Sequence, residues 1–78
     1  MRLNEIIRQY IENRNWSIRE FAAHTRMSET YINACLMENR GMFIPYYVAG
    51  RLYRAFPEES LAHWEQVCQD EYYARNPN

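Results

Sequence analysis

WSIREFAAHTRMSETYINACLM, residues 16–37, decides the fold of this chain, because it predicts two short helices joined by a tight turn. Ser17 is a good N-cap, and Glu20 three residues later completes a capping box, so two backbone donors at the helix start are satisfied reciprocally. Trp16 and Phe21 have the spacing of a hydrophobic staple. The first of the two helices is therefore expected to begin directly after Ser17.

The same pattern recurs eleven residues later. Ser28 is placed to cap a second helix, Met27 and Ile32 have the staple spacing, and Glu29 falls in the first turn, where the helix dipole favours a negative charge. Residues 25–27 fit the three- or four-residue turn of a helix-turn-helix unit. The side chains expected to form its small core are Ile18, Phe21, Ala22, Met27, Ile32, Cys35 and Leu36.

These residues resemble the helix-turn-helix of the Xre type, the family of phage repressors and Cro proteins. The usual wording of that family is close to W-S-Q-x-x-L-A-x-x-x-G-V-S-x-x-x-I-S. The matching positions here are Ser17, Phe21 for Leu, Ala22, Met27 for Val, Ser28, Ile32 and Asn33 for Ser. The resemblance covers about residues 3–56, and it implies an all-α fold, a compact bundle of about five short helices, that binds DNA.

Three positions depart from the family pattern. Ile18 replaces a glutamine that usually helps to hold a DNA phosphate, and Leu36 replaces a glutamate late in the second helix. Arg26 replaces the turn glycine, and a positive φ at a non-glycine residue costs about 1 kcal/mol. These departures leave the fold expectation intact and weaken the expectation of DNA binding.

Length and charge bound the function. A chain of 78 residues buries only about 60 to 65% of its unfolded surface, so one small domain is expected and dimerisation would help it. Residues 1–54 hold eight Arg and five Glu, a net charge of +3, whereas residues 55–78 hold one Arg and five acidic residues, a net charge of −4. The part that resembles a DNA-binding unit is therefore the basic part.

Further helices are expected on both sides of the central stretch. A stripe of apolar residues spaced three and four apart predicts an N-terminal helix that ends at residues 13–15, where Asn tolerates the left-handed conformation. Pro45 is placed to open a helix over about residues 46–56, with Val48, Ala49, Leu52, Tyr53 and Phe56 facing inward. Gly50 in that helix suggests a close approach to another helix.

The last helix is expected to begin at Pro57, because proline suits the first helical position and Glu58 and Glu59 suit the first turn. It should run to Tyr73 or Ala74 and leave a frayed tail over residues 75–78. We therefore expect a helix-turn-helix domain over residues 1–56 and an added C-terminal helix over residues 57–78. That helix either packs on the domain or forms a homodimer contact, or does both, through Leu61, Trp64, Val67, Cys68 and Tyr72.

The second helix of a helix-turn-helix lies in the major groove of double-stranded DNA. Asn33 suits a bidentate contact to adenine, Glu29 suits a cytosine amino group, and the methyl group of Thr30 suits thymine. The full set of expected base contacts is Ser28, Glu29, Thr30, Asn33, Ala34 and Met37. The expected phosphate contacts, from the edges of the motif, are Arg14, Arg19, Arg26, Asn39 and Arg40.

The sequence contains no motif that is typical of an enzyme or of a metal site. His24 and His63 stand alone, Cys35 and Cys68 have no zinc spacing, and no nucleophile elbow or phosphate loop occurs. We therefore expect no cofactor, no metal and no catalysis. No apolar run approaches a membrane span and no secretory segment opens the chain, so we expect a cytoplasmic protein with reduced thiols.

The sequence thus predicts a Cro-like or repressor-like transcription regulator that binds operator DNA as a homodimer, of phage, prophage or mobile-element origin. The alternative is a protein-interaction module with the same fold, such as an antirepressor or the antitoxin of a toxin pair. The net charge, Ile18, Arg26 and Glu29 favour this alternative.

Overall fold

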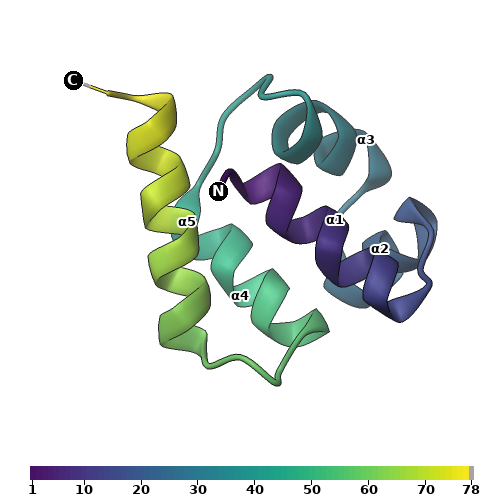
Figure 1. The fold of residues 1–78 in the computed structure, drawn as a ribbon. Helices are drawn as coiled ribbons and strands as arrows, with labels where there is room; N and C mark the ends of the chain where they lie inside the picture. The colour runs from purple at the N-terminus through teal and green to yellow at the C-terminus, as the bar shows by residue number, and fades with distance from the viewer. Residues whose placement is uncertain (78) are drawn as a thin grey trace. The chain divides into compact units, whose positions relative to one another are not determined.

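The computed structural model describes residues 1–77, and these residues contain helices and no strand. The elements, in chain order, are α1 (Leu3–Arg14), α2 (Ile18–Thr25), α3 (Glu29–Tyr31), η1 (Ile32–Met37), α4 (Pro45–Ala55) and α5 (Leu61–Arg75) (Figure 1). Because α3 continues directly into η1, the chain has five helices in its described part. The expected all-α class is confirmed.

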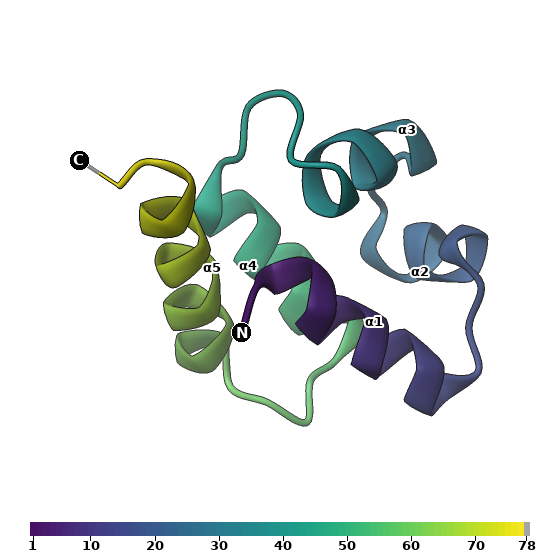
Figure 2. The same cartoon turned by 45° about the horizontal axis from the view of Figure 1, so that its top comes forward.

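Two compact units divide the chain, Met1–Met42 and Phe43–Asn78, which we call unit 1 and unit 2. Unit 1 holds α1, α2, α3 and η1, whereas in unit 2 α4 packs on α5 (Figure 2). This boundary differs from the one expected between residues 56 and 57. The reason is that the helix after Pro45 shares its packing with the last helix, a long-range preference that no local pattern reveals.

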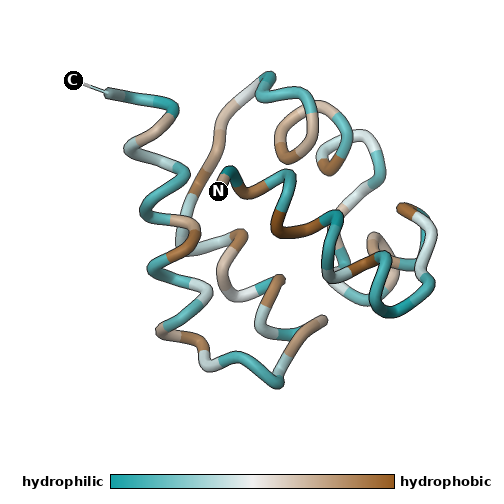
Figure 3. The backbone as a smooth tube through the Cα atoms, viewed as in Figure 1, coloured by the Kyte–Doolittle hydropathy of each residue, from teal (hydrophilic) through white to brown (hydrophobic). Residues whose placement is uncertain are grey.

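Helix α1 follows the expected stripe, with Leu3, Ile7 and Ile11 buried. Figure 3 shows hydrophobic residues recurring between hydrophilic ones along this helix. The carboxylate of Glu5 accepts a hydrogen bond of 2.9 Å from the backbone N–H of Arg2 at the helix start. The helix ends at Asn15, which adopts the left-handed conformation with φ of 61°. The sequence therefore predicted both the buried face and the end of α1.

The two serine caps of unit 1 are formed as expected. Ser17 Oγ accepts from the N–H of Glu20 at 3.1 Å, and Glu20 accepts from the N–H of Ser17 at 2.9 Å, which completes the capping box. Ser28 Oγ accepts from the N–H of Tyr31 at 3.0 Å. The expected core residues are buried except Ile18 and Ala22, which are half-buried; the buried ones are Phe21, Met27, Ile32, Cys35 and Leu36.

The second motif helix widens after one turn, which the sequence did not predict. Residues 32–37 form the π-helix η1, in which the N–H of Glu38 donates to the carbonyl of Asn33 at 3.0 Å. The next backbone hydrogen bond encloses an even wider turn, because the N–H of Arg40 donates to the carbonyl of Ala34 at 2.7 Å. The wider turns change which side chains of this helix face solvent.

Helix α4 begins at Pro45, as the sequence predicted, and buries Val48, Ala49 and Leu52. The expectation for Tyr53 was wrong, because this side chain is 41% exposed. The expected close approach at Gly50 was also wrong: outside the backbone of α4 itself, no described atom lies within 4 Å of where a Cβ would be. One face of α4 is therefore not covered by the residues that the structure describes.

Helix α5 begins at Leu61, four residues later than expected. Ser60 is its N-cap and accepts from the N–H of His63 at 3.0 Å, while Pro57 and Glu58 form a turn. The carbonyl of Phe56 accepts the N–H of Glu59 from the turn at 3.4 Å, and it also accepts the indole N–H of Trp64 at 3.1 Å. This buried hydrogen bond is the tertiary contact that sets the helix start.

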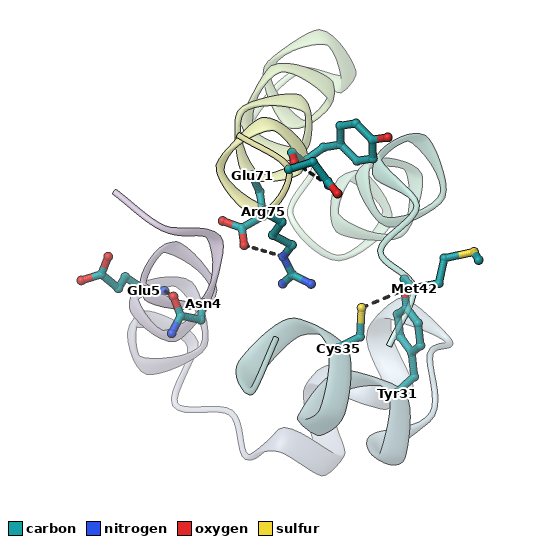
Figure 4. A network of polar contacts seen from close by, with 9 residues as sticks. Asn4, Glu5, Tyr31, Cys35, Met42, Glu71 and Arg75 are labelled. Carbon is teal, nitrogen blue, oxygen red and sulfur yellow. Dashed lines mark hydrogen bonds and ion pairs between the residues drawn. The ribbon is translucent and has the colours of Figure 1, made fainter. Parts of the chain in front are cut away.

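The end of α5 also differs from the expectation of a frayed tail. Arg75 is the last residue of the helix, and its side chain is only 8% exposed. It forms an ion pair of 2.7 Å with Glu71, whose side chain is 4% exposed (Figure 4). Its guanidinium also lies 4.5 Å from the ring centroid of Phe43. Of the expected frayed residues, Asn78 lies outside the described part of the chain.

Candidate nucleic-acid interface

The turn between α2 and α3 is held by a residue that sequence reasoning placed only in the loop. The hydroxyl of Thr25 is buried and donates to the carbonyl of Phe21 at 2.8 Å, and it accepts from the N–H of Met27 at 3.4 Å. Arg26 then takes the left-handed conformation with φ of 59°, at the position where the Xre pattern has glycine. A threonine directly before the turn was the available signal, since its hydroxyl readily bonds the carbonyl four residues back.

The start of the second motif helix presents polar side chains to solvent. Ser28, Glu29, Thr30 and Asn33 are all exposed, as expected for groups that meet base edges. Ala34 and Met37 were expected to face outward with them, and both are half-buried, less open to solvent than the other four. They lie within the wider turns of η1, which rotate later residues away from the face that an α-helix would present.

Glu29 and Arg19 lie together at the exposed edge of α2 and α3. The guanidinium Nε of Arg19 lies 3.7 Å from the Glu29 carboxylate, and the two side chains are 87% and 49% exposed. An ion pair so open to solvent contributes at most about 1 kcal/mol, so either group is easily drawn to another partner. The pair places an expected base contact beside an expected phosphate contact.

The far end of the motif carries a second ion pair. Arg40 Nε and Nη2 both lie close to one carboxylate oxygen of Glu38, at 3.0 and 2.6 Å. Asn39 between them has a positive φ of 58°. The chain then returns to the helix, where the carbonyl of Met42 accepts from Cys35 Sγ at 3.4 Å and from Tyr31 Oη at 3.4 Å (Figure 4).

Arg14 belongs to an aromatic stack that sequence reasoning did not find. Its guanidinium lies 5.3 Å from the ring centroid of Trp16, and that indole stacks on the ring of His24 with centroids 4.0 Å apart. The planes of the two rings differ by only 9°. No helical spacing indicates this contact, because Trp16 lies before the start of α2 and reaches His24 only through the turn at Ser17.

The charge of unit 1 is close to balanced. It contains six Arg and five Glu, a net charge of +1, whereas the expectation of +3 referred to residues 1–54. The two additional arginines of that longer stretch, Arg51 and Arg54, belong to α4 in unit 2. A basic rim around the motif is therefore made by individual exposed side chains, Arg19 and Arg26, rather than by a large excess of charge.

The expected dimer face of α5 is only partly available. Trp64 and Cys68 are fully buried at 0% exposure, so their assignment to a contact between two chains is wrong. Both fall on the side of α5 that is buried in this chain, where Trp64 also packs on Phe56 with ring centroids 5.9 Å apart. Leu61 and Tyr72 are exposed and Val67 is half-buried.

Burial also sets the chemistry of Cys68. It raises the pKa of this thiol from 9.0 to about 12, and the nearby negative charge of Glu71 acts in the same direction. Both cysteines are free thiols. Within residues 1–77, no cluster of three or more His, Cys, Asp or Glu side chains is placed to hold a metal ion. None of the helices described is long and apolar enough to cross a membrane.

We compared the chain with protein-family models, with curated proteins and with solved structures, and none of the three comparisons found a match. The resemblance to the Xre pattern therefore remains an interpretation of the residues themselves. The arrangement of α2, the turn and α3 with η1 is the best supported candidate site.

Proposed function

We propose that this protein is a transcription regulator that binds double-stranded DNA in a sequence-specific manner through α2, α3 and η1. The observation that carries the proposal is the second motif helix, which is buried on one side by Ile32, Cys35 and Leu36 and exposes polar side chains at its N-terminal end. A helix anchored in this way can enter a major groove with its first turns leading.

The position and chemistry of individual residues suggest which of them contact bases and which contact phosphates. Thr30 and Asn33 make base contacts, Asn33 to adenine and Thr30 through its methyl group to thymine. Arg19 and Arg26 contact phosphates on either side of the groove, and Arg19 leaves its weak pair with Glu29 when it does so. Glu29 is then available to a cytosine amino group.

We further propose that the regulator acts as a homodimer on a palindromic operator in the cytoplasm, and that it stems from a phage, prophage or mobile element. The two halves of such an operator lie one helical turn of DNA apart, which a two-fold protein dimer matches. In this scheme regulation follows from protein concentration or from a partner protein.

The test is fluorescence anisotropy with a labelled fragment of the DNA upstream of the coding sequence and with a scrambled fragment, at two salt concentrations. We expect tighter binding to the upstream fragment, and a loss of about 0.9 log units of affinity per log of salt for each phosphate contacted. The variant Thr30→Ala/Asn33→Ala should lose the preference, whereas Gln9→Ala, an exposed amide on α1, should keep it. Equal weak binding to both fragments would overturn the proposal.

A protein-interaction module, such as an antirepressor or antitoxin, is the second candidate. The near-balanced charge of unit 1 favours it, together with Glu29 at the groove-facing helix start, because a carboxylate there repels phosphate. If this candidate is right, Thr30→Ala/Asn33→Ala leaves association with the partner protein unchanged, and DNA binding is absent even at low salt.

A further inference from the structure

The uncovered face of α4 is rich in tyrosine and arginine. Tyr46 is 78% exposed, Tyr53 is 41% exposed and Tyr47 is 37% exposed. Arg54 is exposed beside them, and α4 contains no acidic residue. Three half-exposed or exposed aromatic rings on an eleven-residue helix are a composition typical of protein interfaces, where tyrosine and arginine are enriched.

Gly50 lies at the centre of this face. Glycine in a helix interior is less favourable than alanine by about 1 kcal/mol, and α4 continues regularly on both sides of it. No positive φ requires glycine here, and outside the backbone of α4 itself no described atom comes within 4 Å of the position that a Cβ would occupy. A helix of another molecule that crosses α4 at Gly50 could approach its backbone closely, because no side chain stands in the way.

The sequence of α4 is nearly symmetric about Gly50. Tyr46 and Tyr47 precede it by four and three residues, and Tyr53 and Arg54 follow it by three and four residues. When two copies of α4 cross antiparallel about a two-fold axis at Gly50, Arg54 of each copy lies opposite Tyr46 of the other. Tyr47 of each copy lies opposite Tyr53 of the other. The face is therefore complementary to itself.

We propose that two copies of this chain form a two-fold dimer through α4, with the helices crossing at Gly50. The contact is an isologous one, in which the same surface of each copy meets itself. Each Arg54 guanidinium stacks on the partner's Tyr46 ring, and each Tyr47 packs on the partner's Tyr53. The inference rests on the proposed function only for what the dimer is used for, which is binding to a palindromic operator. The contact between the two chains itself requires no DNA.

Electrostatics permits this arrangement. Arg51 already lies over the ring of Tyr47 in its own chain, 4.9 Å from the centroid, so its charge is directed to the side of the face. Each Arg54 lies about 6 Å along the axis from the crossing point, so two antiparallel copies separate these charges by about 12 Å. This separation exceeds the Debye length of about 8 Å at physiological salt, and the repulsion is largely screened.

Cysteine cross-linking is the direct test. Gly50→Cys places a thiol at the crossing point, where the proposed contact brings two Cα atoms within the range of a disulfide, about 4.4 to 6.8 Å. The matched control is Ala62→Cys, an exposed position on α5. Cys35 and Cys68 are 2% and 0% exposed and do not compete in the folded protein. We expect Gly50→Cys, after mild oxidation, to run at twice its mass on a denaturing gel without reductant, because the disulfide traps even a contact that the added side chain weakens. Ala62→Cys should run there as a single chain.

Equilibrium sedimentation without DNA is the second measurement. Gly50→Ala should stabilise the helix against heat yet weaken the dimer, and these opposite effects separate an interface role from a folding role. Tyr46→Ala and Arg54→Glu should also weaken association, whereas Tyr73→Ala, which removes a ring 61% exposed on α5, should not.

A wild-type chain that remains monomeric at every concentration overturns the inference. Cross-linking that is equal at positions 50 and 62, or a dimer weakened by Tyr73→Ala rather than by Tyr46→Ala, also overturns it. None of these results affects the DNA-binding test. A failed DNA-binding test likewise does not contradict the dimer.

Discussion

The two units of this protein are held together in different ways. In unit 1 the helix starts and turns are fixed by partners close in sequence, such as Ser17 with Glu20 and Ser28 with Tyr31. In unit 2 the decisive contacts join residues farther apart, since Trp64 donates to Phe56 eight residues away and Arg75 lies over Phe43. The comparison teaches that sequence reasoning works best where the structure is locally determined.

The largest expected effect comes from breaking the buried ion pair of unit 2. Glu71→Met or Arg75→Met alone should lower the free energy of unfolding by about 3 to 5 kcal/mol, because each leaves a buried charge without its partner. The double variant should recover most of that loss. Urea unfolding in a Trp16→Phe background measures this, since Trp64 then is the remaining tryptophan and reports on unit 2.

The expectation is contradicted if the double variant loses as much free energy of unfolding as the two single variants lose together, or more. That result would mean that the two side chains act independently rather than as a pair.

The thiol of Cys68 gives a smaller, pH-dependent effect in the same unit. Its pKa is raised to about 12 in the folded protein, so above pH 9.0 the unfolded chain loses a proton that the folded chain retains. Stability from this group is therefore intact below pH 9.0 and falls between pH 9.0 and 12, by up to about 1.4 kcal/mol per pH unit.

The measurement compares urea midpoints of the wild type and Cys68→Ala from pH 8 to 11, a range set by the ionisation of a thiol. The difference between the two urea midpoints should shrink as the pH rises. Both proteins contain the same tyrosines, so the effect of tyrosine ionisation cancels. Parallel curves would show that burial does not hold this thiol protonated.

The smallest expected effect tests the local control of unit 1. Arg26→Gly should raise the stability by up to about 1 kcal/mol, because glycine adopts the positive φ of this turn without strain. Arg8→Gly, the same change at an exposed position inside α1, should lower it by about 1 kcal/mol. Thermal unfolding followed by circular dichroism distinguishes the two signs, and a loss of stability with Arg26→Gly would mean that its side chain makes contacts worth more than the strain.

Much of the fold could be predicted from the sequence, and the misses have physical causes. The start at Ser17, the cap at Ser28 and the left-handed Asn15 follow from side chains that bond neighbouring backbone groups. Pro57 was the expected start of the last helix, but the helix begins after Ser60, where the indole of Trp64 reaches the carbonyl of Phe56.

The candidate site divides in the same way. Sequence spacing placed Ser28, Glu29, Thr30 and Asn33 on the exposed side of the second motif helix. Ala34 and Met37 are less exposed than the spacing of a regular α-helix predicts, because η1 is wider. Sequence spacing also did not pair Arg19 with Glu29, since the two residues belong to different helices.

The sequence by itself determined the helical class, the two caps, the turn at Arg26 and the polar start of the second motif helix. These depend on interactions within a few residues, whose geometry is the same in any fold. Only the tertiary structure decided the grouping of α4 with α5, the burial of Trp64 and Cys68, the ion pair of Glu71 with Arg75 and the open face at Gly50. Packing settles these, because burial depends on which helices meet and not on the pattern of any one of them.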